Sequence, residues 1–448
     1  MKLSILDHLQ FENPTVEQKN ALLAMSAFVD EKDNNDFLIL CGAAGTGKSS
    51  ITTALISFMN AKELTYKIAA PTAKAARLLG RKSNVSSNTI HSMIFDTTVN
   101  KETGEVVFSP KQNEEDTYQI YIVDESSMIS SQVSNEANSL FKCKESVLDT
   151  LVSFAKEGNP KNKIIFLGDN YQLAPIHEKH SYALDKDYLV SNYRLQGSIF
   201  YLTEVKRQED GSYILREATN TRNAIKNNAT NCTINAFRFN SINGATTKYV
   251  ENYMNNPKEY CISINPSHNG NKLFNNLVRN KIFGKDVRKI EIGDWMLVTQ
   301  KWNRNGVELY TGDHVEVLDV NLDCTEIVAG LRFCPIKLKA KALNGEEQII
   351  EDYILIDCID FPSGNMDDIH EKRLRGERFR KNKIYSESGF PSSDRYVGAL
   401  RLTYGHAITC YKAQGGEWDK VFMGTMGMRD LKYQYTAITR AKNTLVLY

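Results

Sequence analysis

Short apolar runs that end at a break in the apolar pattern recur through the first 170 residues of the chain. Residues 36–41 are almost entirely apolar and run into glycines, after which residues 49–56 place apolar side chains at helical spacing. Similar runs recur at residues 67–70, 120–124 and 163–167. Strands that alternate with helical stretches are typical of a parallel sheet with helices on both faces. We therefore predict an α/β domain in this part of the chain.

A second set of apolar runs begins at residues 260–264 and resumes at 420–423 and 444–447. Their lengths suit buried strands, and helical stretches lie beside them. We therefore predict a second α/β domain that is interrupted by an insertion. The predicted boundaries are 1–200 for the first domain, 201–285 and 401–448 for the second, and 286–400 for the insertion.

The insertion has a different pattern from the α/β domains on either side of it. Segments at 295–298, 314–318 and 336–339 are short and alternate between apolar and polar residues, with Asn305-Gly306 and Asn344-Gly345 as turn signals. This pattern predicts a small β-barrel or β-sheet. A further pair of β-prone runs flanks a polar stretch within residues 96–118, which we predict to be a β-hairpin projecting from the first domain.

Composition argues against a membrane protein and against a zinc or disulfide framework, but it does not identify a binding partner. The longest apolar runs fall far short of the roughly 18 residues that suggest a membrane span, and the N-terminus lacks a sustained apolar signal region. Eight scattered cysteines without a C-x-x-C pair argue against a zinc site or a disulfide framework, so we expect a cytoplasmic protein with no membrane partner. Because the formal net charge is only +1, overall basicity cannot be the argument for nucleic-acid binding.

The segment Gly42-Ala43-Ala44-Gly45-Thr46-Gly47-Lys48-Ser49 matches the phosphate-binding pattern G-x-x-x-x-G-K-[ST] in full. A predicted strand precedes it and a predicted helix follows, which is the context that this chemistry requires. Glycines let backbone N–H groups approach phosphates at a helix N-terminus, where the helix dipole favours negative charge. We predict ATP binding by Gly45, Thr46, Gly47, Lys48, Ser49 and Ser50, with Lys48 on the β- and γ-phosphates and Ser49 as a Mg²⁺ ligand.

Two carboxylates follow the apolar run at residues 120–123. A buried strand of a parallel sheet would deliver Asp124 and Glu125 at its carboxyl end, where ligands of open α/β sheets bind. We predict that Asp124 holds Mg²⁺ and that Glu125 orients or deprotonates the attacking water. Asp-Glu after an apolar run is a weak signal alone, and the upstream glycine-rich loop makes it a strong one.

With these motifs in order, the chain resembles superfamily 1 helicases, and within them the Dda/RecD-like group. The matching segments are residues 14–18, 70–76, 89–92, 123–128, 168–175, 202–208, 411–417 and 435–441. The resemblance implies that Gln18 reads the adenine, that Gln172 senses the γ-phosphate, and that Arg207 and Arg440 act as arginine fingers. It also implies nucleic-acid contacts by Pro71, Thr72, Lys74, Thr89, His91, Thr409 and Lys412. Tyr411 departs from the histidine usual in this group, which puts the DNA contact of that loop in doubt.

Several of these residues also have simpler interpretations. Arg207 and Arg440 could be ordinary surface arginines, and His91 could be a hydrogen-bonded residue at a helix start. Phe95 and Phe108 flank the predicted hairpin, and they could stack on bases or simply pin the hairpin to the core. The basic run 372–381 could be a solvated face or a surface that follows phosphates.

The resemblance implies an α/β fold of two RecA-like P-loop domains with parallel sheets, a β-hairpin insertion and a β-rich, SH3-like inserted domain. It implies a monomer that binds ATP in the cleft between the two RecA-like domains, uses Mg²⁺, moves 5′ to 3′ on single-stranded DNA and unwinds forked DNA. Possible partners are a single-strand-binding protein or replication proteins. The process served could be replication, recombination or repair. A compact chain with little sequence outside the motor would suit an enzyme of a phage or a mobile element. An RNA helicase, or a nucleotide-gated binding or remodelling ATPase that does not unwind, remains an alternative.

Overall fold

The computed structural model describes residues 4–83, 85–99, 106–133, 141–204, 213–342, 345–361, 363–428 and 430–448. The chain divides into two compact units. Unit 1 comprises Met1–Asp96, Phe108–Asn135 and Cys143–Ala229, and unit 2 comprises Thr97–Val107, Glu136–Lys142 and Thr230–Tyr448. Among the described residues, no helix combines the length and the apolar character that crossing a bilayer requires. The domain boundaries expected from the sequence stay a prediction.

Unit 1 is built on a parallel sheet. Its strands in spatial order are β3 (Asn88–Thr89), β2 (Tyr66–Ala70), β6 (Ile120–Val123), β8 (Lys163–Gly168), β1 (Phe37–Gly42) and β9 (Gly197–Leu202). Each of these neighbouring pairs is parallel, so the carboxyl ends of β6, β8 and β1 lie side by side at one edge. The α/β class with a parallel sheet, predicted from the apolar runs, is confirmed.

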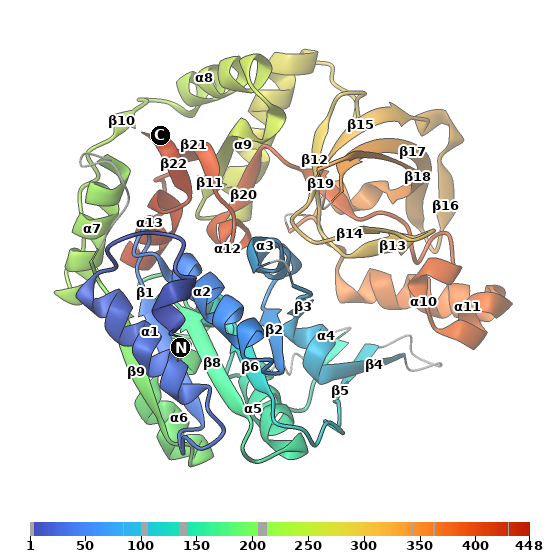
Figure 1. The fold of residues 1–448 in the computed structure, drawn as a ribbon. Coiled ribbons are helices and arrows are strands. Elements are labelled where there is room, and N and C mark those ends of the chain that lie inside the picture. The colour runs from blue at the N-terminus through green and yellow to red at the C-terminus, as the bar shows by residue number, and fades with distance from the viewer. Residues whose placement is uncertain are drawn as a thin grey trace. The chain divides into compact units, whose positions relative to one another are not determined.

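Helices cover both faces of this sheet. The helices of unit 1 are α1 (Val16–Phe28), α2 (Lys48–Ala61), α3 (Ala73–Ser83), α4 (Ile90–Ile94), α5 (Val147–Gly158), α6 (Lys186–Tyr193) and α7 (Tyr213–Lys226), with 3-10 turns η1 (Ile5–His8), η2 (Ser126–Met128) and η3 (Tyr182–Leu184). The helices α1 and α2 lie on one face, beside β1 (Figure 1), and Leu38 and Leu40 of β1 pack with them. Phe37 and Ile39 pack with α4, α5 and α6 on the other. Because successive side chains of a strand alternate between faces, a strand buried on both sides must be apolar throughout.

Unit 2 contains a second parallel sheet. Its strands in spatial order are β10 (Phe237–Arg238), β22 (Ala441–Leu447), β21 (Trp418–Met423), β11 (Cys261–Asn265) and β20 (Ala407–Thr409). The helices beside it are α8 (Ile242–Asn255), α9 (His268–Phe283), α12 (Cys410–Ala413) and α13 (Leu431–Ile438), with the 3-10 turn η4 (Lys258–Tyr260). Tyr249 of α8 and Phe274 of α9 pack with Phe422 and Val446 of the sheet. The second parallel sheet, predicted from three separated apolar runs, is therefore confirmed.

An antiparallel sheet follows within unit 2. Its strands are β16 (Glu326–Val328), β17 (Leu331–Lys341), β15 (His314–Val320), β12 (Trp295–Val298) and β19 (Leu402–Tyr404) in spatial order, with β18 (Glu347–Leu355) also on β17. A separate hairpin joins β13 (Trp302–Arg304) to β14 (Val307–Leu309). Asn305 and Gly306 at its turn have φ of 54° and 77°, the left-handed backbone that this two-residue turn requires. The predicted β-rich character of this region is confirmed, whereas Asn344 of the other predicted turn lies outside the described residues.

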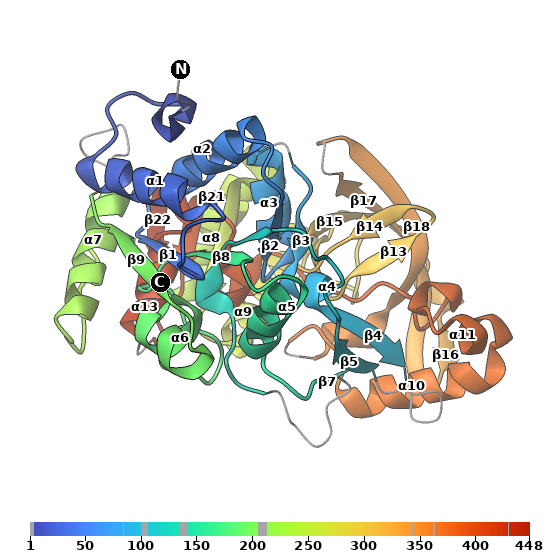
Figure 2. The same cartoon turned by 60° about the horizontal axis from the view of Figure 1, so that its bottom comes forward.

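Two helices, α10 (Asp368–Lys381) and α11 (Lys383–Ser388), interrupt the β-rich region, together with the 3-10 turns η5 (Leu322–Cys324), η6 (Ile356–Ile359) and η7 (Pro391–Ser393). The helices lie beside the β16 end of the sheet (Figure 2). The basic run 372–381 forms most of α10. It is not wholly a solvated face, because Leu374 is fully buried and Arg375 pairs with the buried Glu371.

The predicted hairpin region contains β4 (Phe95–Val99) and β5 (Val106–Pro110), which form a small sheet with β7 (Phe141–Lys142). The Thr98 hydroxyl donates to the Val107 carbonyl across the pair at 3.4 Å. Residues 100–105 between the two strands lie outside the described residues. Residues 111–118, which the sequence also assigned to this region, are not in a strand.

Candidate nucleotide site and nucleic-acid surfaces

The glycine-rich loop of unit 1 connects the end of β1 to the start of α2. Gly45 and Gly47 adopt φ of 80° and 84°, a left-handed backbone that favours glycine. The loop closes on itself because the buried Thr46 hydroxyl donates to the Ala43 carbonyl at 2.8 Å. No side chain caps α2, since its capping residue is Gly47. The first-turn N–H groups of α2 are therefore suited to an external anion.

Lys48 carries the positive charge of this loop, and three carboxylates act on it. Asp124 and Glu125 follow β6, and Asp169 follows β8. Burial lowers the pKa of the Lys48 ammonium, but Glu125, Asp124 and Asp169 more than offset this, and its pKa lies above the usual value. Lys48 therefore stays charged at neutral pH, as a phosphate-binding lysine must. Ser49 and Ser50, in the next two positions of α2, are exposed.

Glu125 and Gln172 lie in the loops that follow β6 and β8 of unit 1. Within the described residues, Glu125 Oε2 and Gln172 Oε1 are buried without a hydrogen-bond donor. Glu125 also has φ of 48°, and its N–H donates to Asp124 Oδ1 at 2.9 Å. Buried acceptors without donors are uncommon and costly in folded proteins. Because both loops leave the same sheet edge as the glycine-rich loop, these oxygens are suited to a ligand or water that donates to them.

Gln18 lies beside the same loop, although in a different relation from the one that the resemblance implies. Its Nε2 donates to the Thr46 carbonyl at 2.9 Å, and its Oε1 accepts from Thr15 N at 2.9 Å. The residue is 2% exposed and belongs to the capping box of α1. A Cβ at Gly47 would approach Gln18 Nε2 to 2.7 Å, so the amide packs directly on the loop. These contacts make Gln18 a support of the loop, and adenine contact by it stays a prediction.

Asp169 is the residue of this site that the sequence reasoning left without a role. It is 1% exposed, and its Oδ1 accepts from Tyr171 N at 3.0 Å. Its charge also raises the pKa of Lys48. The available signal was its position directly after a buried strand, the same signal that identified Asp124.

The predicted strand contacts of unit 1 lie at two helix starts. Pro71 follows β2, Thr72 Oγ1 accepts from Ala75 N at 3.2 Å, and Lys74 lies in the first turn of α3. Thr89 caps α4 in the same way, because its Oγ1 accepts from the backbone N–H of Ser92 at 3.2 Å. Both threonine hydroxyls therefore stabilise helix starts, and contacts of these segments with phosphates remain a prediction.

His91, Phe95 and Phe108 form an aromatic cluster. The ring centroids of Phe95 and Phe108 are 5.8 Å apart, and that of His91 lies 5.8 Å from Phe95 and 6.2 Å from Phe108. Phe95 is 4% exposed and belongs to the core beneath α5, whereas Phe108 is half-buried at its edge and His91 is exposed. The core-pinning interpretation therefore fits Phe95, whereas base stacking by Phe108 and a nucleic-acid contact by His91 stay predictions.

Thr409 and Lys412 lie in unit 2, at the end of β20 and in α12. Thr409 Oγ1 accepts from Lys412 N at 3.5 Å and caps the helix. Lys412 Nζ donates to the Ser363 carbonyl at 2.8 Å, and burial lowers the pKa of its ammonium. Among the described residues, no carboxylate lies within ion-pair distance of Lys412. Its charge is thus directed inward without a fixed counterion.

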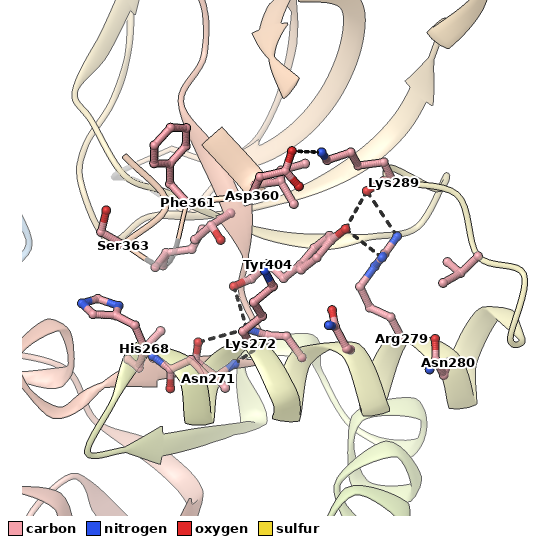
Figure 3. Close-up of a pocket in the computed structure, with 18 of the residues that line it drawn as sticks. His268, Asn271, Lys272, Arg279, Asn280, Lys289, Asp360, Phe361, Ser363 and Tyr404 are labelled. Atoms are coloured by element: carbon pink, nitrogen blue, oxygen red, sulfur yellow. Dashed lines mark hydrogen bonds and ion pairs between the residues drawn. The ribbon is translucent and has the colours of Figure 1, made fainter. Parts of the chain in front are cut away.

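Lys412 lines a cavity of about 480 Å³ in unit 2 (Figure 3). His268, Asn271 and Lys272 of α9 form one wall, and Asp360, Phe361 and Ser363 lie opposite. The described lining contains five lysines and arginines, which are Lys272, Arg279, Arg288, Lys289 and Lys412, but a single carboxylate, Asp360. Asp360 pairs with Lys289. Arg279 and Arg288 pair with Asp294 and Glu291, so the lining cations without a paired carboxylate among the described residues are Lys272 and Lys412. These two lysines make the cavity suited to an anionic ligand.

Arg440 lies at the end of α13 in unit 2 and is 6% exposed. Its guanidinium donates to the carbonyls of Thr436 and Gly416 and to the Thr439 hydroxyl, at 3.1–3.2 Å. These acceptors are neutral, and no carboxylate among the described residues lies within ion-pair distance. The surface-arginine interpretation is therefore wrong for Arg440. Arg207 lies outside the described residues.

Comparisons with known proteins agree with these motifs. The model described as "AAA domain" matches residues 15–234, and the model described as "UvrD-like helicase C-terminal domain" matches residues 404–448. The first covers the glycine-rich loop and both carboxylate loops, and the second covers Thr409, Lys412 and Arg440.

Two curated relatives match part of the chain. The ATP-dependent DNA helicase dda of Enterobacteria phage T4 is 30% identical over 217 residues, which cover 48% of this chain and 44% of that protein. The ATP-dependent RecD2 DNA helicase of Deinococcus radiodurans is 25% identical over 163 residues, which cover 36% of this chain and 19% of that protein. The matched region thus spans less than half the length of either relative.

Solved structures match over nearly the whole chain. The Pif1 helicase from Bacteroides, in complex with ADP-AlF3 and ssDNA, aligns over 98% of this chain and 92% of that one. Its TM-score is 0.53 at 14% identity. At this identity the likeness concerns the fold, and it agrees with the two parallel sheets and the additional β-rich sheet.

Proposed function

We propose that the chain is an ATP-driven DNA helicase, because it belongs to the Dda/RecD-like group of superfamily 1 helicases. It hydrolyses ATP, moves along single-stranded DNA from 5′ to 3′ and separates the strands of forked duplexes. The observation that carries this proposal is the placement of Lys48 after β1 and of Asp124 and Glu125 after β6, at the same edge of one parallel sheet and close enough for both carboxylates to raise the pKa of Lys48.

The glycine-rich loop and Lys48 bind the triphosphate. The uncapped N-terminus of α2 offers N–H groups, and the ammonium of Lys48 neutralises charge on the β- and γ-phosphates. Glu125 orients a water molecule and accepts a proton from it as the water attacks the γ-phosphorus. The bond between that phosphorus and the oxygen bridging to the β-phosphate breaks, which releases ADP and inorganic phosphate. Gln172 contacts the γ-phosphate and senses its loss.

Ser49 and Asp124 would hold Mg²⁺. A hydroxyl and a carboxylate are the hard oxygen donors that this ion prefers. Ser49 follows Lys48 in the sequence, and the charge of Asp124 raises the pKa of Lys48. The bound ion would neutralise charge on the phosphate oxygens. Arg440 and Arg207 remain the proposed arginine fingers, and the neutral acceptors around Arg440 leave its charge available to a phosphate.

The charged cavity of unit 2 supports binding of the DNA backbone. Lys412 and Lys272 face it without a paired carboxylate among the described residues, so their charge can act on phosphodiesters. Thr409 lies one turn before Lys412. Thr72, Lys74 and Thr89 of unit 1 are proposed as further backbone contacts, because helix starts direct N–H groups toward phosphates.

Stimulation of ATP hydrolysis by nucleic acid tests the proposal. Phosphate release would be measured with Mg²⁺ alone, with single-stranded DNA and with single-stranded RNA of the same sequence. We expect strong stimulation by DNA and weak stimulation by RNA. Stronger stimulation by RNA would favour an RNA helicase. ATP hydrolysis without any ATP-dependent strand separation would favour a remodelling ATPase.

A further inference from the structure

Glu178 joins two loops of unit 1 that carry the proposed catalytic residues. One loop follows Glu125 and runs through η2 to Ser131, and the other follows Gln172 and runs to Glu178. Glu178 Oε1 accepts from Ser130 Oγ at 2.6 Å and from Ser131 N at 3.0 Å. Its Oε2 accepts from Ser131 Oγ at 3.0 Å. A single carboxylate thus receives three hydrogen bonds from the neighbouring loop, and charged acceptors make hydrogen bonds stronger than neutral ones.

Further bonds transmit this connection toward the catalytic side chains. Met128 N donates to the Glu125 carbonyl at 3.0 Å, and the Ser181 hydroxyl donates to the Ser126 carbonyl at 3.1 Å. On the other loop, the N–H of Gln172 donates to the Asp169 carbonyl at 3.2 Å. The loops begin at β6 and β8, which are adjacent parallel strands. They are therefore fixed together at the sheet and again by Glu178.

Two observations indicate that the spacing of these loops matters for chemistry. Glu125 Oε2 and Gln172 Oε1 are both buried without donors among the described residues, so no hydrogen bond within the described protein fixes either oxygen. Glu125 also has a left-handed backbone, which is sparsely populated for a residue with a side chain and persists only when neighbouring structure enforces it. The position of each of these oxygens therefore depends on the loop that carries it.

We infer that Glu178 is a positioning residue that sets the distance between Glu125, which orients the attacking water, and Gln172, which contacts the γ-phosphate. This inference rests on the proposed ATP hydrolysis and adds a residue outside the phosphate-binding loop. Glu178 does not touch the nucleotide. It acts on the rate of hydrolysis rather than on ATP affinity, because Lys48 and the α2 N-terminus bind the triphosphate independently of it.

The test compares Glu178→Gln with the wild type in DNA-stimulated ATP hydrolysis. The substitution removes the negative charge that strengthens all three bonds, and because an amide nitrogen only donates, the Ser131 hydroxyl would have to turn from donor to acceptor. We expect kcat to fall about ten- to hundredfold, because small misplacements of catalytic groups have effects of that order. KM for ATP and the Kd of a non-hydrolysable ATP analogue should change less than twofold. Glu114→Gln, the same substitution at an exposed position of unit 1, serves as the control and should match the wild type.

Each outcome is informative. Unchanged kcat in Glu178→Gln would overturn the inference while leaving the proposed function standing, and so would equal losses of kcat and analogue affinity. If Glu178→Gln fails to fold, Ser131→Ala replaces it, because it removes one of the three bonds. That variant should lower kcat to a smaller extent at constant analogue affinity, and unchanged kcat there would overturn the inference. A wild-type protein that hydrolyses no ATP in the presence of DNA would overturn the proposed function and this inference together.

Discussion

The side-chain amide of Gln18 donates a 2.9 Å hydrogen bond to the backbone carbonyl of Thr46, within the glycine-rich loop. The two residues are 28 positions apart in the chain. The bond ties the first turn of α1 to the loop that would hold the phosphates of ATP. Gln18 therefore connects helix capping to the conformation of the nucleotide site.

This contact predicts the effect of changing Gln18 on nucleotide binding. Gln18→Glu keeps an acceptor for Thr15 N but loses the donor to Thr46. Leaving that buried carbonyl unpaired should weaken ATP binding about tenfold. ATP and GTP should weaken equally, because the defect lies in the phosphate-binding loop. Kd values for both nucleotides would check this, and a loss confined to ATP would show instead that Gln18 reads the adenine.

Glu125→Gln should separate nucleotide binding from hydrolysis. Asp124 and Lys48 remain to hold Mg²⁺ and the phosphates, whereas the attacking water loses its carboxylate. General-base catalysis contributes about a hundred- to ten-thousandfold, so kcat should fall by that order. ATP binding should persist, as measured by equilibrium titration. If the variant lost ATP affinity and Asp124→Asn retained it, the roles assigned to the two acids would be reversed.

Phe108→Ala tests whether the hairpin region takes part in strand separation. A base stacked on an aromatic ring contributes about 1–3 kcal/mol, comparable with the roughly 1.4 kcal/mol needed to open one base-pair step. The variant should keep DNA-stimulated ATPase activity and single-strand translocation but lose much of its unwinding rate. Equal losses in all three activities would identify Phe108 as a packing residue.

Phe95→Ala is the matched comparison. Its ring is 4% exposed in the core, so its loss should lower the free energy of unfolding by about 3–5 kcal/mol. Thermal denaturation would distinguish the two variants. Phe108 is half-buried, and its removal should cost much less stability.

The sequence predicted strands that are buried on both faces. It did not predict elements that depend on contacts with residues far away in the chain. Residues 120–123 and 163–167 could be identified as strands because both of their faces are covered by helices, which requires apolar side chains throughout. The helix α10 could not be identified in this way. Its buried Glu371 pairs with Arg401, 30 residues away, and nothing local in a run of charges reveals such a partner.

The candidate site shows the same division. A local pattern with strict spacing identified the glycine-rich loop and Lys48. The roles of Gln18 and Glu178 depend on hydrogen bonds across 28 and 47–48 positions, which no local pattern encodes. Asp169 is intermediate. The sequence shows that it follows a buried strand, but its effect on the pKa of Lys48 depends on the fold.

His406 predicts how the stability of unit 2 depends on pH. The residue is 1% exposed, with its ring centroid 4.9 Å from that of Tyr253 and 5.7 Å from that of Tyr249. Burial lowers its pKa to about 3, and the charges of His314, Arg279 and Lys258 add to the effect. The folded state therefore keeps His406 neutral, while the unfolded chain binds a proton below its usual pKa of 6.5.

Stability from His406 is therefore present above pH 6.5 and is lost as the pH falls from there toward 3. At pH 4.5 the loss should reach about 2–3 kcal/mol, at 1.36 kcal/mol for each pH unit. His406→Phe cannot be protonated, and its ring suits the aromatic surroundings. Urea denaturation at pH 7.5 and 4.5 should show a smaller loss in this variant than in the wild type. Equal losses would remove His406 as a source of the acid sensitivity.

Strand separation on substrates of defined polarity tests the central claim most directly. Two duplexes that share one sequence would carry a single-stranded overhang at the 5′ or the 3′ end, with Lys48→Ala as the control. Lys48→Ala should unwind neither, because it removes the cation that the glycine-rich loop offers to the β- and γ-phosphates. We expect the wild type with Mg²⁺ and ATP to unwind the 5′-overhang duplex and to leave the 3′-overhang duplex intact. Unwinding of the 3′-overhang duplex alone would contradict the direction, and ATP hydrolysis without unwinding of either duplex would contradict the helicase account.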